Sequence, residues 1–307
     1  VEGNTLIDAS GGFGVDDYYF SKTMKQVLHC EMNEELSVIV AHNFQSLNVN
    51  NCRCLEGNST KIIEKLNQKT DWIYIDPSRR NESEGKVFML KDCSPNVPEL
   101  LEFYMRHTNN ILIKTAPLLD ITAGLNELKY VKKIHVVAVN NEVKELLWIL
   151  ENNFLGQPII TAVNLTETKN DLFTFPFNTT NDSNFSLPEK YLYEPNAAIM
   201  KSGGFNEISS QFQLKKLHQH SHLYTSEQLI PFPGRVFEIQ EILKYSKSDM
   251  KLKLENQKSN ITLRNFPDTV ENIRKKWKIK DGGQLYSFFT TDLQNNKIVL
   301  LCKKINT

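Results

Sequence analysis

The sequence lacks any uninterrupted apolar run of about 18 residues, so it predicts no transmembrane helix, and we expect no signal peptide. It has five cysteines, an odd number, and no CxxC pair. Cys52 and Cys54 have the wrong spacing for half of a zinc knuckle. These absences predict a cytoplasmic protein with reduced thiols and without a bound metal.

A net charge is also lacking, because 36 Lys and Arg balance 36 Asp and Glu. Taken alone, this balance argues against a nucleic-acid partner. The charges are nevertheless unevenly placed. Residues 1–166 hold 16 basic and 21 acidic residues, whereas residues 167–307 hold 20 and 15. A net charge of −5 in the first part suits a cationic ligand, and +5 in the second part suits a polyanion.

The 307 residues are enough for two domains. Strands alternate with helices up to about residue 166, with helices such as Glu34–Leu47 and Pro98–His107 between the strands. This pattern predicts an α/β domain over residues 1–168, with a doubly wound, mostly parallel, seven-stranded Rossmann-like sheet. The predicted strands are Thr5–Ala9, Val27–Glu31, Arg53–Glu56, Trp72–Asp76, Ile111–Thr115, Ile134–Val139 and Ile159–Leu165. Because the chain starts at Val1, close to the first strand, we expect that an upstream segment is missing.

A polar, turn-rich stretch follows, and residues 169–187 are predicted to be a linker or long loop. Residues 188–307 have the pattern of a smaller α+β domain. Its predicted helices lie near Glu207–Leu217 and Thr269–Lys276. Its predicted strands are Val236–Ile242, Lys251–Leu254, Leu285–Thr290 and Lys297–Cys302.

The first strand ends at Asp8 and runs into a glycine-rich loop. The loop consists of Ser10, Gly11, Gly12, Phe13 and Gly14. Glycines allow a tight turn and a close approach of the backbone to a ligand. Gly12 and Gly14 fit the dinucleotide fingerprint, but Asp17 stands where its third glycine belongs. Asp16 and Asp17 would repel a phosphate at this helix start. The loop therefore predicts a cationic cofactor without phosphates, such as S-adenosylmethionine, with Asp8 beside its amino group.

Three further residues are predicted to line a nucleoside site. Glu31 ends the second strand 17 residues after Gly14, where an acid binds ribose hydroxyls in nucleoside-binding sheets. Met32 is placed to pack on the adenine face. Asn58, after the third strand, is placed to read the adenine edge.

The fourth predicted strand delivers Asp76 and Pro77 to the same sheet edge. With Asp8, Gly12, Gly14 and Glu31, they resemble the motifs of class I S-adenosylmethionine-dependent methyltransferases, over residues 4–166. The resemblance implies direct methyl transfer at Asp76 and Pro77. Members that methylate exocyclic amines of bases carry Asn/Asp-Pro-Pro-Tyr/Phe in this loop. Here Ser78 and Arg79 replace Pro-Tyr, so the aromatic side chain that stacks on the base is absent. The planar guanidinium of Arg79 can instead stack on a base or hold a phosphate.

The second part of the chain resembles a bacterial methyltransferase family with a C-terminal THUMP-like domain, over residues 188–305. The resemblance rests on the stretches Tyr191–Phe205, Phe232–Ile239 and Ile273–Gly283. It implies an RNA substrate, tRNA or rRNA, held by this domain. The predicted phosphate contacts are Arg79, Arg80, Lys114, Arg274, Lys275, Lys276 and Lys278.

Other interpretations stay open at this point. His218, His220 and His222 alternate, which a metal site allows, but no acid or cysteine neighbours them, so we expect a polar turn. The chain is also compatible with a non-catalytic RNA-binding protein that keeps a relic methyltransferase fold. A methyltransferase acting on DNA, protein or a small molecule is a further alternative. Asp17 disfavours a nicotinamide oxidoreductase.

Overall fold

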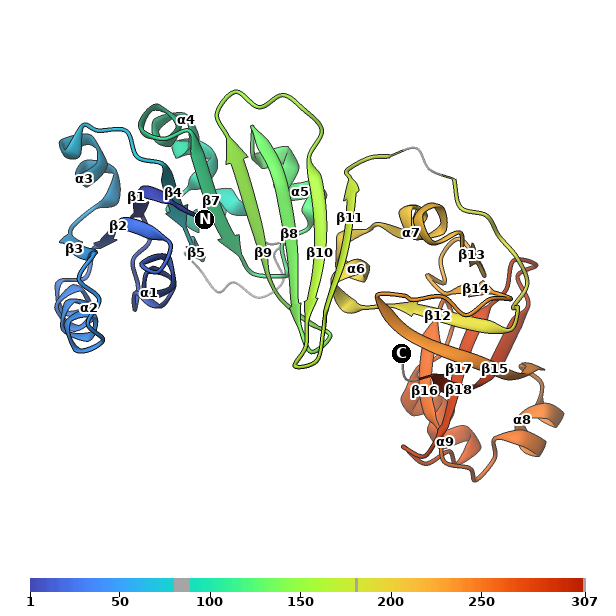
Figure 1. The fold of residues 1–307 in the computed structure, drawn as a ribbon. Coiled ribbons are helices and arrows are strands. Elements are labelled where there is room, and N and C mark those ends of the chain that lie inside the picture. The colour runs from blue at the N-terminus through green and yellow to red at the C-terminus, as the bar shows by residue number, and fades with distance from the viewer. Residues whose placement is uncertain (80–88, 180–181, 306–307) are drawn as a thin grey trace. The chain divides into compact units, whose positions relative to one another are not determined.

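The computed structural model describes residues 1–79, 89–179 and 182–305, so Arg80 lies outside the described residues. The chain divides into two compact units, Val1–Thr161 and Ala162–Thr307. Figure 1 shows the elements of both units. The first part of the chain contains β1 (Gly3–Asp8), α1 (Val15–Phe20), β2 (Met24–Glu31), α2 (Glu34–Ser46), β3 (Cys52–Glu56), α3 (Ser59–Leu66), β4 (Trp72–Ile75), β5 (Ser78–Arg79), η1 (Leu90–Asp92), β6 (Cys93–Ser94), α4 (Val97–His107), β7 (Asn110–Thr115), α5 (Ile121–Glu127), β8 (Val131–Val139), β9 (Glu142–Glu151), β10 (Ile159–Leu165) and β11 (Asn170–Pro176).

These strands form a nine-stranded sheet in the order β11-β10-β8-β9-β7-β4-β1-β2-β3. From β3 to β7 the neighbouring strands are parallel. β9 is antiparallel to both β7 and β8. The predicted α/β class is confirmed, and all seven predicted strands form. The predicted seven-stranded, mostly parallel sheet is wrong, because the sheet has nine strands and is mixed.

The two strands that the sequence did not reveal are β9 and β11. Asn140 and Asn141 have φ of 50° and 64° and turn the chain directly from β8 into β9. Such a two-residue turn with left-handed backbone is typical of a tight antiparallel hairpin. β11 lies inside residues 169–187, the segment predicted to be a linker or long loop. The predicted domain limits at 168 and 188 stay a prediction.

The central parallel strands carry the core of the first unit. Ile7 on β1 and Ile73 and Ile75 on β4 are buried. Leu6, Met24, Val27, Tyr74 and Leu112 form one packed cluster across four strands. Strands that are buried on both faces place their polar groups at their ends, which is where the candidate site lies.

The second part of the chain forms a seven-stranded sheet in the order β13-β14-β12-β15-β18-β17-β16. All its pairs are antiparallel except β16 with β17. Its elements are β12 (Tyr191–Pro195), α6 (Ala197–Ser202), α7 (Phe205–Phe212), β13 (Lys215–Lys216), β14 (Tyr224–Ser226), β15 (Gly234–Lys244), α8 (Lys247–Lys253), β16 (Asn260–Arg264), α9 (Val270–Trp277), β17 (Leu285–Thr291) and β18 (Lys297–Ile305).

The predicted strand Lys251–Leu254 is wrong, because this segment belongs to α8 and its C-terminal end. The alternation of Lys and Leu imitates the period of a strand. Met250 and Leu254 are buried, whereas Leu252 between them is exposed. Burial at every fourth residue is the period of a helix.

Two apolar clusters lie on this sheet. One contains Ile273 and Trp277 of α9 with Met250 of α8 and Phe289 of β17. The other contains Phe288, the next residue of β17, with Leu217 and Leu223. Since successive strand residues point to opposite faces, the two clusters cover opposite faces of the sheet. Within the described residues, no helix is both long and apolar enough to cross a membrane.

The contact between Gly124 and Trp148 provides a test of the packing in the first unit. A Cβ atom at Gly124 would lie 2.4 Å from Cη2 of the buried Trp148. Alanine favours a helix over glycine by about 1 kcal/mol, but overpacking costs about 1–3 kcal/mol. We therefore expect Gly124→Ala to lower the free energy of unfolding, measured by urea denaturation. In a Trp148→Phe background this loss should disappear, and an equal loss in both backgrounds would contradict the packing.

Candidate active site

Polar side chains gather where the parallel strands β1, β2, β4 and β7 end. Asp8 ends β1, Glu31 ends β2, Asp76 follows β4, and Lys114 is the last residue but one of β7. Because these strands are parallel neighbours, their carboxyl ends meet at one edge of the sheet. The structure thus brings the predicted acids of three different strands to the same edge.

Asp8 organises the glycine-rich loop. Its side chain is 1% exposed. Its Oδ1 accepts hydrogen bonds from the Ser10 backbone N–H (2.7 Å), the Ser10 hydroxyl (2.7 Å) and the Gly11 N–H (3.0 Å). Three donors on one carboxylate oxygen fix the start of the loop against the end of β1.

Gly11 and Gly12 both have the left-handed backbone conformation that favours glycine, but their surroundings differ. Gly11 has φ +46°, and a Cβ atom there would lie 2.5 Å from the carbonyl oxygen of Cys30. Gly12 has φ +66°, and a Cβ atom there would meet no atom within 4 Å. The backbone at Gly12 therefore faces open space beside the buried end of β1, which fits a ligand that approaches the backbone closely.

Ser10 joins the ends of β1 and β4. Its hydroxyl donates to Asp8 Oδ1 and accepts the backbone N–H of Asp76 at 2.8 Å. One hydroxyl thus connects the glycine-rich loop to the residue predicted to be catalytic. Ser10 was predicted to contact the cofactor, whereas its contacts in the structure are with these two residues.

Glu31 holds the other side of the loop. Its Oε2 accepts the Gly12 N–H at 2.8 Å, and its Oε1 accepts the Asn33 N–H at 2.7 Å. Met32 beside it is 73% exposed and free to contact a ligand. Asn58 caps α3, because its Oδ1 accepts the backbone N–H groups of Thr60 and Lys61. The roles of Glu31, Met32 and Asn58 in cofactor binding stay predictions.

Asp76 belongs to a charged network that the sequence did not reveal. The Lys114 ammonium contacts Asp76 Oδ2 at 3.0 Å and Asp16 Oδ2 at 2.5 Å. The Tyr74 hydroxyl donates to the same Asp16 oxygen at 2.6 Å. Lys114 was predicted to contact RNA phosphate, and this role stays a prediction. In the structure its charge is shared by two carboxylates of the candidate site.

The network also sets the protonation of its members. Burial raises the pKa of Asp76, and the hydrogen bond and positive charge of Lys114 counteract part of this rise. Burial alone would lower the pKa of Lys114, but the hydrogen bonds and charges of Asp16 and Asp76 outweigh it and raise that pKa. Lys114 thus stays charged, and Asp76, with 45% of its side chain exposed, is available to accept a hydrogen bond from a ligand.

The segment after Asp76 is described only in part. Pro77 is buried, and Ser78 and Arg79 form β5, which pairs with Cys93 and Ser94 of β6. Cys93 therefore lies close to the backbone of the Asp76 loop, although 17 residues separate the two in the sequence. Arg80 lies outside the described residues, so the predicted roles of Arg79 and Arg80 stay untested.

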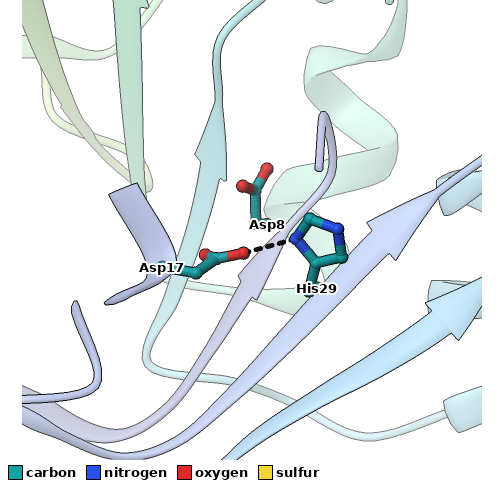
Figure 2. Close-up of side chains that lie close together, drawn as sticks. All are labelled: Asp8, Asp17 and His29. Atoms are coloured by element: carbon teal, nitrogen blue, oxygen red, sulfur yellow. Dashed lines mark hydrogen bonds and ion pairs between the residues drawn. The ribbon is translucent and has the colours of Figure 1, made fainter. Parts of the chain in front are cut away.

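A buried group of three titratable side chains lies under the glycine-rich loop (Figure 2). Asp8 comes from β1, Asp17 from α1 and His29 from β2. Asp17 Oδ2 and His29 Nδ1 are 2.6 Å apart, and both side chains are 0% exposed. Asp17 Oδ1 and His29 Nε2 have no hydrogen-bond partner among the described residues. The sequence singled out Asp17 as a misplaced acid, but nothing marked His29 inside its apolar strand.

Burial controls the charges in this group. It raises the pKa of Asp17 to about 7, helped by the negative charge of Asp16. It also raises the pKa of Asp8, to which the charge of Asp17 contributes. It lowers the pKa of His29, although the charges of Asp8 and Glu31 oppose this. In this small, dry volume burial therefore favours the uncharged form of each group: protonated carboxyls and a neutral imidazole.

The same three side chains could hold a cation. Their ligand-type atoms lie within 4.8 Å of one another. However, Asp8 Oδ1 is engaged with three loop donors, and the hydrogen bond of His29 Nδ1 to Asp17 would have to break. The arrangement fits an internal hydrogen-bonded group better than a metal centre.

The basic side chains of α9 differ in their contacts. Arg274 pairs with Asp281 and donates to the Ser259 carbonyl at 3.2 Å, so it fixes the end of the helix. Lys276 Nζ lies 5.1 Å from the centre of the Trp277 ring. Lys275, Lys276 and Lys278 are exposed. The phosphate contacts predicted for these three lysines stay predictions.

The three alternating histidines do not form one face. His218, His220 and His222 lie in the turn between β13 and β14. Asn265 Nδ2 lies 2.9 Å from His218 Nδ1, and the His222 ring stacks on Phe205.

The geometry defines an α/β protein with a mixed nine-stranded sheet, followed by a mostly antiparallel seven-stranded sheet. Residues 191–233 match a ferredoxin-like domain family, and residues 234–304 match a THUMP domain-like family. The crystal structure of a proposed methyltransferase from Porphyromonas gingivalis W83 is 33% identical, with a TM-score of 0.89, over 99% of this chain and 78% of that chain. The chain belongs to the family of this protein, and its second unit carries the ferredoxin-like and THUMP-like domains.

Two more distant likenesses concern methyltransferases. A Clostridium acetobutylicum protein described as an uncharacterized RNA methyltransferase is 28% identical over 98 residues, which are 32% of this chain and 22% of that protein. The match therefore spans about a fifth of the length of this curated relative. A proposed methyltransferase from Streptococcus mutans, in complex with S-adenosylhomocysteine, is 14% identical with a TM-score of 0.35 over 49% of this chain and 89% of that chain. This last score is too low to support an argument about function.

The raised pKa of Asp17 predicts a pH-dependent stability. A carboxyl with a pKa of 3.8 when unfolded and about 7 when folded stabilises the folded state at low pH and loses that contribution as the pH rises through 7. At about 1.4 kcal/mol per pKa unit, the loss is on the order of 4 kcal/mol.

Asp17→Asn removes this titration, so the stability of the variant relative to the original protein should improve steadily from pH 4 to pH 7. Urea denaturation at several pH values measures the difference. Glu35→Gln, at an exposed position of α2, is the control and should give a flat difference. A flat difference for Asp17→Asn would contradict the buried, proton-holding carboxyl.

Proposed function

We propose that the protein is an S-adenosylmethionine-dependent methyltransferase that acts on RNA by direct methyl transfer. The observation that carries the proposal is the convergence of Asp8, Glu31 and Asp76 around a glycine loop that faces open space. Support for the reaction class comes from the family, whose P. gingivalis member is a proposed methyltransferase. Support for RNA comes from the THUMP-like match and from the name of the C. acetobutylicum relative.

The residues of the site fit such a cofactor. Gly12 leaves room for a ligand against the backbone, and Glu31 offers a carboxylate that two backbone amides orient. The carboxylates of Asp16, Glu31 and Asp76 outnumber the ammonium of Lys114 at this edge, which favours a cationic group over a phosphate. When bound, S-adenosylmethionine supplies a methyl group that its sulfonium already activates.

The chain supplies positioning and a hydrogen-bond acceptor. Ser10 fixes the backbone of Asp76, and Lys114 fixes its side chain. In this role Asp76 accepts a hydrogen bond from the attacking amine or amide of the acceptor, and Pro77 stiffens the turn beside it. Because Lys114 is held by Asp16 as well as Asp76, the carboxylate of Asp76 keeps one orientation.

A direct test measures cofactor binding and transfer on the same protein. Isothermal titration with S-adenosylmethionine should give saturable binding, and absence of binding would refute the enzyme proposal. Tritiated-methyl transfer to total RNA from a strain that lacks the gene should label RNA, with DNA and protein fractions as alternatives. Label in DNA or protein alone would refute RNA as the substrate.

Asp76→Ala should separate binding from transfer. We expect cofactor affinity to change by less than about threefold, and transfer to fall by about 100-fold or more, the range for a lost proton acceptor. Asp92→Ala, which removes an exposed carboxylate of η1, is the matched control and should leave both unchanged. Retained transfer in Asp76→Ala would exclude the role given to this residue.

The exposed lysines of α9 predict a change in salt dependence. Reversing Lys275 and Lys278 to Glu should flatten the plot of log affinity for RNA against log salt by roughly 1.4, since each contact to single-stranded RNA contributes about 0.7. Arg274 is left intact because it holds Asp281 and the helix end. Lys247→Glu with Lys251→Glu, two exposed lysines of α8, is the control. An unchanged slope in the α9 variant would remove this helix from the RNA surface.

A further inference from the structure

Buried polar side chains that lack a hydrogen-bond partner or a counter-charge among the described residues lie in the ferredoxin-like part of the second unit and near the ends of β16 and β17. Lys216 on β13 is 4% exposed, and no carboxylate of the described residues pairs with it. His222 Nδ1, Arg264 Nε and Thr290 Oγ1 are also buried and unpartnered among those residues. Burying polar groups without partners is costly, so a cluster of them indicates a missing ligand.

Lys216 and His222 share the ring of Phe205. The imidazole of His222 stacks on this ring with a centroid distance of 3.7 Å and an interplanar angle of 23°. Lys216 Nζ lies 5.6 Å from the centroid of the same ring. The turn that carries His222 is closed by the hydrogen bond from Leu217 N–H to the Leu223 carbonyl at 3.0 Å. The imidazole and the ammonium are therefore held near each other by the fold.

Arg264 and Thr290 lie on β16 and β17, at the opposite edge of the seven-stranded sheet from β13. They are register partners on β16 and β17. Asn265, the residue after Arg264, has its amide nitrogen 2.9 Å from His218 Nδ1, in the turn that carries His222. The end of β16 is thus tied to the turn between β13 and β14, and the unpartnered atoms come from three separate segments.

The described acids neutralise only part of the positive charge of this cluster, because Arg264 shares one carboxylate with Arg235 and no described carboxylate pairs with Lys216. Glu194 is buried, and it already accepts hydrogen bonds from Arg264 at 2.9 Å and Arg235 at 2.7 Å. Burial lowers the pKa of His222 to about 4, helped by the positive charges of Lys216, Arg264 and His220. His222 is therefore a neutral imidazole near pH 7. Burial also lowers the pKa of Lys216, and no neighbouring carboxylate of the described residues opposes this shift.

We propose that Lys216, His222 and Arg264, with Thr290, form a binding site for a phosphate group. A phosphate offers several acceptor oxygens in different directions, which matches donors that come from three segments and include an arginine and a lysine. The site goes beyond the methyl-transfer proposal and does not depend on it. Its ligand is a phosphodiester of bound RNA or a free phosphate ion.

The test titrates the full chain with inorganic phosphate in a phosphate-free buffer and measures the heat. We expect saturable binding that weakens at least tenfold in Lys216→Met and in His222→Phe, which keeps the stacked ring but removes both nitrogens. Lys215→Met, at the exposed neighbouring position of β13, removes the same charge and should bind like the original protein. No saturable binding, or equal losses in Lys216→Met and Lys215→Met, would overturn the proposal.

Thermal unfolding shows whether Lys216→Met still folds, so that weaker phosphate binding cannot be ascribed to unfolding. Because Lys216→Met removes a buried charge without a described counter-charge, its midpoint without phosphate should rise above that of the original protein. Added phosphate should raise the midpoint of the original protein and leave that of the variant unchanged. If phosphate raises both midpoints equally, Lys216 is not part of a phosphate site.

A competition experiment distinguishes the two sources of the phosphate. A short single-stranded RNA without modified bases is bound to the full chain, and inorganic phosphate is added at constant ionic strength. Release of RNA by phosphate, together with weaker RNA binding of Lys216→Met, assigns the site to the RNA backbone. Phosphate binding without either effect assigns it to free phosphate. Both results support the site, and they stand even if cofactor binding fails.

Discussion

The hydroxyl of Ser10 is the contact on which the candidate site depends most. It donates to Asp8, which shapes the glycine-rich loop, and it accepts the backbone N–H of Asp76, which follows β4. β1 and β4 are paired over three residues only, so this contact extends their pairing beyond the strands. A single small side chain thus links the glycine-rich loop to Asp76, the residue on the acceptor side in the proposed function.

Charge is arranged around this contact in two layers. Beneath the loop, burial favours the uncharged forms of Asp8, Asp17 and His29. At the surface, Asp16 and Asp76 share the ammonium of Lys114. The buried group supports the loop without exposing charge. The surface group leaves the oriented carboxylate of Asp76 accessible to a ligand. An acidic first unit and a more basic second part thus serve different partners in the proposal.

The sequence predicted the strand ends well, because apolar strands followed by Asp8, Glu31 and Asp76 carry a local signal. It missed β9, whose tight Asn140–Asn141 turn contains no glycine, and it took Lys251–Leu254 for a strand because Lys and Leu alternate there. It could not find the pairing of Lys114 with Asp16 and Asp76, which are 98 and 38 residues away. Such contacts depend on the order of the strands in the sheet, and a short sequence motif does not predict that order.

The bond between Glu31 and the Gly12 N–H has a consequence for any ligand with hydroxyl groups. Glu31 Oε2 accepts this amide and still has a second lone pair, so a hydroxyl can join it without displacing the loop. If a ribose binds here as proposed, one carboxylate orients both the loop backbone and the diol. The position of the ligand and the shape of the loop are then coupled through a single side chain.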